Sequence, residues 1–198
     1  VVASHYRTYV RVRVQQIALP STTLAFNFVA LVYGNLLTTH IRTNSDLLPA
    51  EELPTILLGT TNICDFLGRI AALGLLKEQS GLLPCRLLQR CLKRRSCMGF
   101  LLLLRFSTVA ACMICSLMLE ANAVHSDGAM VGLYSSGAAV GGMLTVATTH
   151  LAQTRCMATS GPNMADYSPI PCPLAGQIMF LSCILGSLIG AMFPPLLP

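Results

Sequence analysis

Five apolar segments, each about as long as a membrane-crossing helix, constrain this chain more than any other feature of its sequence. The hydrocarbon core of a bilayer is about 30 Å thick, so a helix needs about 20 mostly apolar residues to cross it. Only 11% of the residues are charged, whereas a soluble domain carries about 25%. We therefore expect an all-α integral membrane protein, a five-helix bundle in contact with the lipid bilayer. The expected transmembrane helices cover residues 17–39, 53–76, 98–119, 128–150 and 173–196.

The basic residues between these segments predict the orientation of the bundle, because Lys and Arg near helix ends stay on the cytoplasmic side. Most of them lie in the amino-terminal segment and in the loop 77–97, and the opposite loops hold only Arg42. The N-terminus is expected in the cytoplasm and the C-terminus outside the cell, with the plasma membrane as the expected location. This account of the basic loop is preferred to a nucleic-acid or lipid-headgroup patch, so no nucleic-acid partner is expected.

The nine cysteines lie mostly in apolar runs or in the basic loop, and they are interpreted as buried hydrophobes or reduced thiols. Cys112 and Cys115 form a CxxC inside an apolar segment with no second pair, which favours core packing over metal or redox chemistry. The chain has no GxSxG, HExxH or Walker loop. We expect neither an enzyme nor a cofactor. The chain has no initiator Met and no signal peptide, and we expect it to be a fragment of a longer protein.

The stretch NICDFLGRI, residues 62–70, places two charges inside the second segment. An ionisable residue at the bilayer centre costs at least about 2.5–3.5 kcal/mol and usually faces a cavity or a partner. Asp65 and Arg69 are four residues apart and can pair on one helix face. Thr61 lies on the same stripe and Asn62 is one turn from Asp65, and this stripe is expected to point into the bundle. The pair is either a structural salt bridge that holds helices together or part of a polar solute site.

Further polar and small residues recur within the other segments. Arg105 is expected at the depth of Arg69. Together with Asp65, the two arginines give the segments a net charge of +1, which carbonyls, water or a helix outside this chain would balance. Thr23, Asn27 and Asn35 recur at multiples of four, and they indicate equally well interhelical hydrogen bonds or a cavity lining. Small-residue seams predict close helix packing, and they are Gly128-xxx-Gly132, Gly137-xxx-Gly141 and Ser182-xxx-Gly186-xxx-Gly190.

Four of the segments resemble the C-terminal half of the equilibrative nucleoside transporter family. NICDFLGR resembles the aspartate-x-x-x-arginine signature of that family's eighth helix, and LLLLRFSTVAACMIC resembles the ninth, which also carries an arginine. GLYSSGAAVGG is similar to the start of the tenth helix, and PLAGQIMFLSCILGSLIGAMF to the eleventh. The order and the long basic loop also agree. The first segment differs, because it lacks a Phe-Pro near its outer end, and the third lacks a proline one turn after its arginine.

This resemblance implies helices seven to eleven of a major-facilitator-like carrier that moves nucleosides or nucleobases by alternating access. Asp65 and Arg69, with Asn62 and Thr61, would bind the ribose or the base, and Arg105 and Asn27 would have gate or structural roles. The partner is then a six-helix amino-terminal half. The alternatives are a non-transporting truncated protein whose Asp65–Arg69 pair is structural, a proton-coupled nucleoside carrier with Asp65 as proton carrier, and a carrier of another solute.

Overall fold

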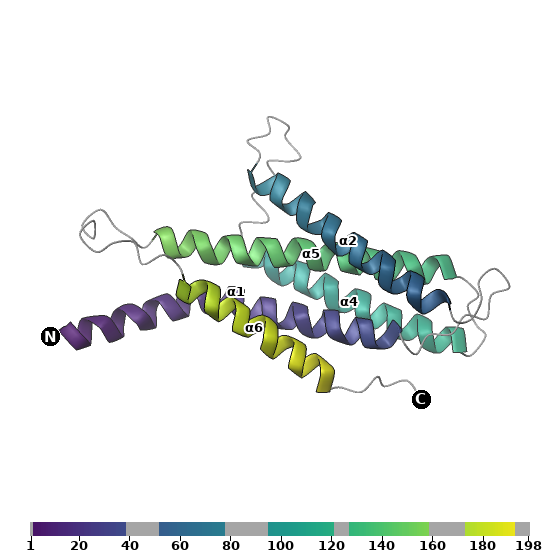
Figure 1. The fold of residues 1–198 in the computed structure, drawn as a ribbon, viewed down its shortest axis with the longest axis horizontal. Coiled ribbons are helices and arrows are strands. Elements are labelled where there is room, and N and C mark those ends of the chain that lie inside the picture. Colours follow the sequence, from purple (N-terminus) through teal and green to yellow (C-terminus); the bar gives the residue numbers. More distant parts are fainter. Residues whose placement is uncertain (1, 39–51, 78–94, 121–126, 159–172, 193–198) are drawn as a thin grey trace.

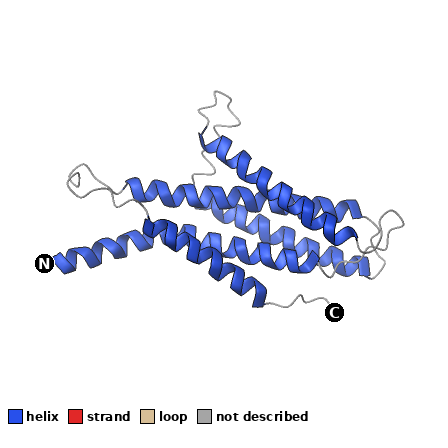
Figure 2. Cartoon of the chain, viewed as in Figure 1, coloured by secondary structure: helices blue, strands red, loops and turns tan. Residues whose placement is uncertain are grey.

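The computed structural model describes residues 2–38, 52–77, 95–120, 127–158 and 173–192, and all of them are helical (Figure 2). The helices are α1 (Val2–Thr38), α2 (Glu52–Lys77), α4 (Arg95–Glu120), α5 (Asp127–Ala158) and α6 (Pro173–Met192). Each contains a stretch long and apolar enough to cross a membrane. For the described residues, the expectation of an all-α fold with five helices long and apolar enough to span a membrane is therefore confirmed.

The spans in the helices differ from the expected ranges mainly at their ends. They are Ile17–Thr38, Glu52–Leu76, Ser96–Cys115, Gly128–Thr154 and Ala175–Met192. Helix α1 begins at Val2, well before the expected start at residue 17, and its first turns extend past the neighbouring end of α5 (Figure 1). At about 1.5 Å per residue it is longer than a bilayer is thick. Most of the basic loop and residues 193–196 lie outside the described residues.

Helix α5 lies at the centre of the bundle (Figure 1). It packs against α2 along much of its length and also contacts α4 and α1. Helix α6 packs mainly on α1 and has few contacts with α5. The bundle therefore consists of two tightly packed pairs, α2 with α5 and α1 with α6, and α4 lies against both α5 and α1.

The α2–α5 crossing depends on glycines on both helices. A Cβ on Gly68 would collide with the backbone carbonyl of Ala139, and a Cβ on Gly142 would collide with the backbone carbonyl of Asp65. Only residues without a Cβ let two helix backbones approach this closely. Helix α2 therefore approaches α5 most closely at Asp65 and Gly68.

The α1–α6 crossing also depends on glycines, here on α6. A Cβ on Gly186 would collide with the carbonyl of Ala25, and one on Gly190 would lie 3.0 Å from the carbonyl oxygen of Val29. These contacts agree with the predicted seam on α6. The predicted seam Gly128-xxx-Gly132 is wrong, because nothing lies within 4 Å of either Cβ position and both residues are exposed. They lie near the start of α5, away from its crossing points.

Large apolar side chains cover the outside of the bundle. A soluble protein rarely exposes contiguous apolar surface on this scale, but lipid chains solvate it well. The two outer helices α2 and α6 and the side helix α4 carry most of it. The exposed residues include Ile63, Phe66, Leu67, Ile70, Leu73, Phe100, Leu103, Ile114, Phe180, Leu181, Leu185 and Leu188. This surface is that of an integral multi-pass membrane protein.

We predict that Gly68→Ala destabilises the bundle by about 1–3 kcal/mol, because the new methyl group must displace the backbone of α5. Gly74→Ala is the matched control on the same helix, since nothing lies within 4 Å of its Cβ position. It should be neutral or stabilising by up to about 1 kcal/mol, from helix propensity. Thermal loss of helical circular dichroism in detergent measures both. Equal midpoints for the two variants would contradict the close crossing.

Candidate functional site

The Asp65–Arg69 ion pair lies at the middle of α2. The Arg69 Nη2 atom is 2.6 Å from Asp65 Oδ2, and Asp65 is one residue from the middle of its span. The Asp65 side chain is 16% exposed, whereas that of Arg69 is 42% exposed. Because both residues belong to α2, their ion pair joins no two helices. A charged pair thus reaches the surface of the bundle at the depth where lipid is most apolar.

Thr61 and Asn62 lie on different faces of α2. Thr61 is buried, shares the face of Asp65 and donates its hydroxyl hydrogen to the Leu57 carbonyl at 2.5 Å. The side chain of Asn62 is exposed, and so is Phe66 one turn further on. The expectation that Asn62 points into the bundle is therefore wrong. Successive helical residues are rotated by about 100°, and α2 packs chiefly on α5, so Asn62 turns outward.

Arg105 is buried inside the bundle, with only 4% of its surface exposed. Its guanidinium lies over two glycines of α5: a Cβ on Gly137 would be 2.9 Å from Arg105 Nη1, and one on Gly141 would be 3.3 Å from Nε. Asp65 is close enough to interact with it electrostatically. No described residue makes a hydrogen bond with Nε. The glycines of the predicted α5 seam therefore make room for an arginine side chain.

Asn27 links α1 to α5 beside this arginine. Its Nδ2 donates to the Gly141 carbonyl at 3.1 Å and to Thr145 Oγ1 at 3.0 Å. Its Oδ1 is buried and has no hydrogen-bond partner among the described residues. Thr23, one turn earlier, instead donates to the Leu19 carbonyl of its own helix. Of the two accounts of the α1 polar stripe, interhelical hydrogen bonding therefore holds for Asn27.

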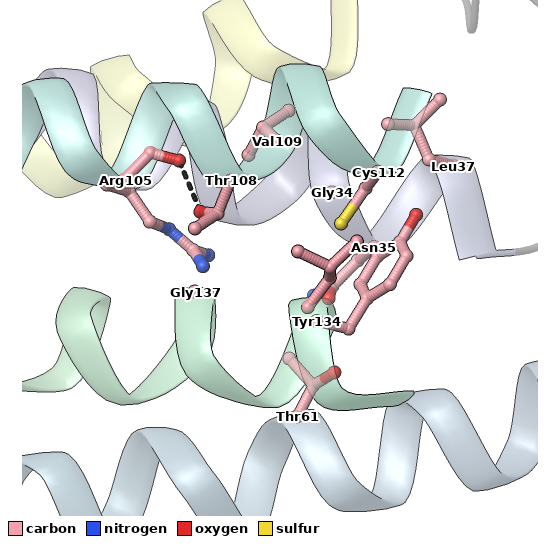
Figure 3. Close-up of a pocket in the computed structure, with 11 residues that line it drawn as sticks. Gly34, Asn35, Leu37, Thr61, Arg105, Thr108, Val109, Cys112, Tyr134 and Gly137 are labelled. Atoms are coloured by element: carbon pink, nitrogen blue, oxygen red, sulfur yellow. Dashed lines mark hydrogen bonds between the residues drawn. The ribbon is translucent and has the colours of Figure 1, made fainter. Parts of the chain in front are cut away.

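Beside Arg105 lies a small, partly open cavity with a mixed polar and apolar lining, which includes Asn35 of the α1 stripe (Figure 3). The space open to the centre of a water-sized sphere is about 10 Å³, which is room for about one water molecule. Pockets for drug-sized ligands measure about 300–1,000 Å³, so this cavity does not hold a nucleoside. Its polar lining consists of Asn35, Thr61, Arg105, Thr108, Cys112 and Tyr134.

Thr108 and Tyr134 are lining residues that the sequence analysis missed. The Thr108 hydroxyl donates to the Arg105 carbonyl at 2.7 Å, and its position three residues after Arg105 is a signal that helix periodicity offers. Tyr134 is 6% exposed, and its hydroxyl has no partner among the described residues. Nothing local in GLYSSGAAVGG distinguishes this tyrosine from an ordinary apolar core residue.

The polar groups of four helices meet at one depth. Asn27, Arg105 and Gly141 each lie within one residue of the middle of their spans, as Asp65 does. The structure thus brings together the sequence-predicted residues Asn27, Thr61, Asp65 and Arg105 near the bundle centre. Arg69 lies at the edge of this group, and Asn62 lies outside it.

The cysteines contribute to packing in the described part of the chain. Cys112 belongs to a buried apolar cluster with Val109 and Tyr134, and Cys115 packs against that cluster. Among the described residues, no three His, Cys, Asp or Glu side chains are grouped so that they could hold a metal ion.

The chain matches no protein-family model, no curated protein and no solved structure.

We predict that Asn27→Ala lowers the free energy of unfolding by about 0.6–2 kcal/mol, the range for interhelical hydrogen bonds in membranes. The variant loses both donor contacts to α5. Asn62→Ala, the same change at an exposed position, should alter stability by less than about 0.5 kcal/mol. Denaturant titration in mixed micelles compares the two. A loss at Asn62 that equals the loss at Asn27 would contradict the assigned contacts.

Proposed function

We propose that this chain forms the C-terminal half of a transporter of the equilibrative nucleoside type. In this proposal it carries nucleosides or nucleobases by alternating access across the plasma membrane, with its N-terminus in the cytoplasm and its C-terminus outside. The observation that carries the proposal is the Asp65–Arg69 pair near the middle of a membrane-spanning helix, with the arginine 42% exposed.

The Arg69 side chain is partly exposed within the membrane-spanning part of α2. A guanidinium that faces lipid at the bilayer centre is costly, so intramembrane charges face a water-filled cavity or other protein. The Arg69 side chain is 42% exposed, although its Nε atom is buried and has no partner among the described residues. This edge of α2 is therefore expected to border a polar path and not lipid.

The chemistry of the pair suits a polyhydroxylated solute. An aspartate accepts hydrogen bonds from hydroxyl groups, and an arginine donates in a fixed planar fork. A ribose offers adjacent hydroxyls that can both donate and accept. The resemblance of NICDFLGR to the family's eighth helix supplies the substrate class. Asp65 and Arg69 are then the main binding residues, and Thr61 supports the same helix face.

The small internal cavity indicates where the solute site lies. It has room for about one water molecule, so a nucleoside binds at the edge of the bundle and not inside it. An edge site needs a second wall, which the proposed six-helix amino-terminal half supplies. Transporters of such two-part architecture bind substrate near the midplane between their halves, which is the depth of Asp65.

Arg105 and Asn27 were expected to have either a gate role or a structural role, and we propose the structural role. Both are buried, and Asn27 bonds directly to α5. Their side chains fill the α1–α4–α5 junction, away from the exposed edge of α2. In this proposal they hold the helices that position α2, and they do not contact the solute.

The competing reading, in which Asp65 and Arg69 only hold helices together, has less support. The ion pair forms within one helix, and the α2–α5 contact is made by Gly68 and Gly142. A structural salt bridge between helices needs partners on two helices, and Asp65 reaches a second helix only through its electrostatic interaction with Arg105, with which no ion pair within 4 Å is formed. The pair is therefore available for a solute.

We predict that Asp65→Asn lowers uptake of radiolabelled adenosine and uridine at least about tenfold, since a hydrogen bond to a charged group contributes about 1.5–3 kcal/mol. The assay uses the full-length protein that contains this chain, in cells without endogenous nucleoside transport. Surface expression should stay near the wild-type level. Glu52→Gln, an exposed carboxylate at the start of the same helix, is the matched control and should transport normally.

Arg69→Lys should lower uptake as well, because an ammonium group lacks the planar fork. Unchanged uptake in both Asp65→Asn and Arg69→Lys would reject the proposed site.

Competition by unlabelled purines and pyrimidines separates nucleosides from other solutes. Uptake that rises with an inward proton gradient, and loses this dependence in Asp65→Asn, would favour the proton-coupled alternative.

A further inference from the structure

We propose that Asn27 is a positioning residue for the proposed solute site: its Oδ1 atom accepts a hydrogen bond from Arg105 Nε, and this bond keeps the guanidinium away from the Asp65 carboxylate. The inference rests on the proposed function, because Asp65 is the residue that would bind the solute. Asn27 lies on α1 and acts only through Arg105.

The carboxamide of Asn27 is held in one orientation, with its oxygen left unbonded. Only 3% of Asn27 is exposed. Its Nδ2 donates to the Gly141 carbonyl at 3.1 Å and to Thr145 Oγ1 at 3.0 Å. Its Oδ1 is buried and has no hydrogen-bond partner among the described residues. Buried acceptors in folded proteins almost always have a donor, so a donor is expected beside Oδ1.

Arg105 supplies a donor at this place. A Cβ on Gly141 would lie 3.3 Å from Arg105 Nε and 3.3 Å from Asn27 Oδ1, so the two atoms flank the position of one missing side chain. Nε is buried and, like Oδ1, has no partner among the described residues. A guanidinium N–H donates and an amide oxygen accepts. Because glycine places no methyl group between them, a small side-chain rotation closes the bond.

This bond would determine where the charge of Arg105 lies. Arg105 is within electrostatic reach of Asp65, but the two form no ion pair within 4 Å. The guanidinium instead lies over Gly137 of α5 (Figure 3). Nε belongs to the rigid planar group, so a bond at Nε fixes the whole guanidinium. Without that bond the charge would turn toward Asp65, because a buried charge is stable when it is paired and hydrogen-bonded.

Such a turn would occupy the proposed binding residue. Asp65 is already bonded to Arg69 through Oδ2 at 2.6 Å. A second arginine on the same carboxylate would take the acceptor positions that solute hydroxyls need, because an ionised carboxylate only accepts. Loss of the Asn27 acceptor should therefore weaken solute binding and leave the later steps of transport unchanged.

The first test is a double-mutant cycle on the purified full-length protein in detergent, without any solute. The thermal midpoint of helical circular dichroism is measured for Asn27→Ala, Arg105→Met and the double variant. Arg105→Met removes the donor and keeps a long, flexible side chain. We expect the double variant to lose about 1–3 °C less than the sum of the two single losses, as for one hydrogen bond. Additive losses would overturn the bond and leave each atom with a water molecule of its own.

Gly141→Ala tests the same contact without removing either side chain. The new methyl group would stand 3.3 Å from both atoms and hold them apart, so Asn27→Ala should cost less in this background than in the wild type. Gly132→Ala, on the same helix with nothing within 4 Å of its Cβ position, is the matched control and should leave that cost unchanged. These variants decide if Arg105→Met does not fold, and equal costs in both backgrounds would overturn the bond.

The positioning role is tested by the kinetics of radiolabelled adenosine uptake, normalised to surface expression. Asn27→Ala should raise KM about three- to tenfold and leave the maximal rate per molecule near that of the wild type. Asn27→Asp loses the same two donor contacts to α5 but keeps an oxygen beside Arg105 Nε. It should therefore lower the thermal midpoint and keep the wild-type KM. Asn27→Ala combined with Arg105→Met should also recover the wild-type KM.

A purely structural role of Asn27 predicts that KM and stability change together. Equal KM values for Asn27→Ala and Asn27→Asp would therefore overturn the positioning role, and so would a raised KM that persists in the variant without Arg105. The transport proposal fails in a different way, because the wild-type protein would then take up no nucleoside. The double-mutant cycle contains no nucleoside and still decides whether Asn27 and Arg105 are bonded.

Discussion

The glycines at the middle of α5 are the constraint on which the rest of the bundle depends. Gly142 lets the backbone of α2 approach at Asp65, while Gly137 and Gly141 leave space for the guanidinium of Arg105. The carbonyl of Gly141 accepts a hydrogen bond from Asn27 of α1. Three neighbouring helices are therefore positioned by the absence of side chains on one short stretch. In lipid, where no hydrophobic effect drives helices together, such close packing and interhelical hydrogen bonds supply the association energy.

This arrangement separates two polar groups that lie at the same depth. Arg105 and Asn27 face inward, where α1, α4 and α5 meet, and they are almost fully buried. Asp65 and Arg69 lie at the edge of the α2–α5 pair, with Arg69 half-exposed. The inner group is held by neighbours and suits a structural role. The outer group includes an arginine side chain that is 42% exposed, which suits the proposed site shared with a second domain.

The two glycine crossings also bear on how such a protein could move. Helix α2 is packed closely on α5 and α6 on α1, whereas α5 and α6 have few contacts with each other. Motion within either pair would break close backbone contacts. Because α1 also packs on α5 and bonds to it through Asn27, the proposed alternating-access cycle is expected to move the two pairs together against the amino-terminal half.

Much of the fold follows from local sequence, because hydrocarbon leaves a backbone few options. Every backbone N–H and C=O must be satisfied within the membrane, so five apolar stretches of sufficient length predict five helices. Helix periodicity likewise predicts that Asp65 can pair with Arg69. Whether a residue faces the bundle or the outside depends instead on which neighbouring helices pack against its own helix. Asn62 turns outward because α2 is packed chiefly on one side, and no pattern within α2 reveals which side that is.

The sequence by itself determined the helices, their number in the described chain and the charged residues they carry, since these depend on hydropathy and spacing along the chain. Only the tertiary structure decided that Arg105 is buried while Arg69 is partly exposed, and that Tyr134 lines a cavity together with that buried arginine. It also decided that Gly137 and Gly141 receive side chains while Gly132 receives none. The physical reason is that these properties depend on contacts between helices distant in sequence. In lipid such contacts are decided by which faces can approach closely, a property of pairs of helices that no single segment encodes.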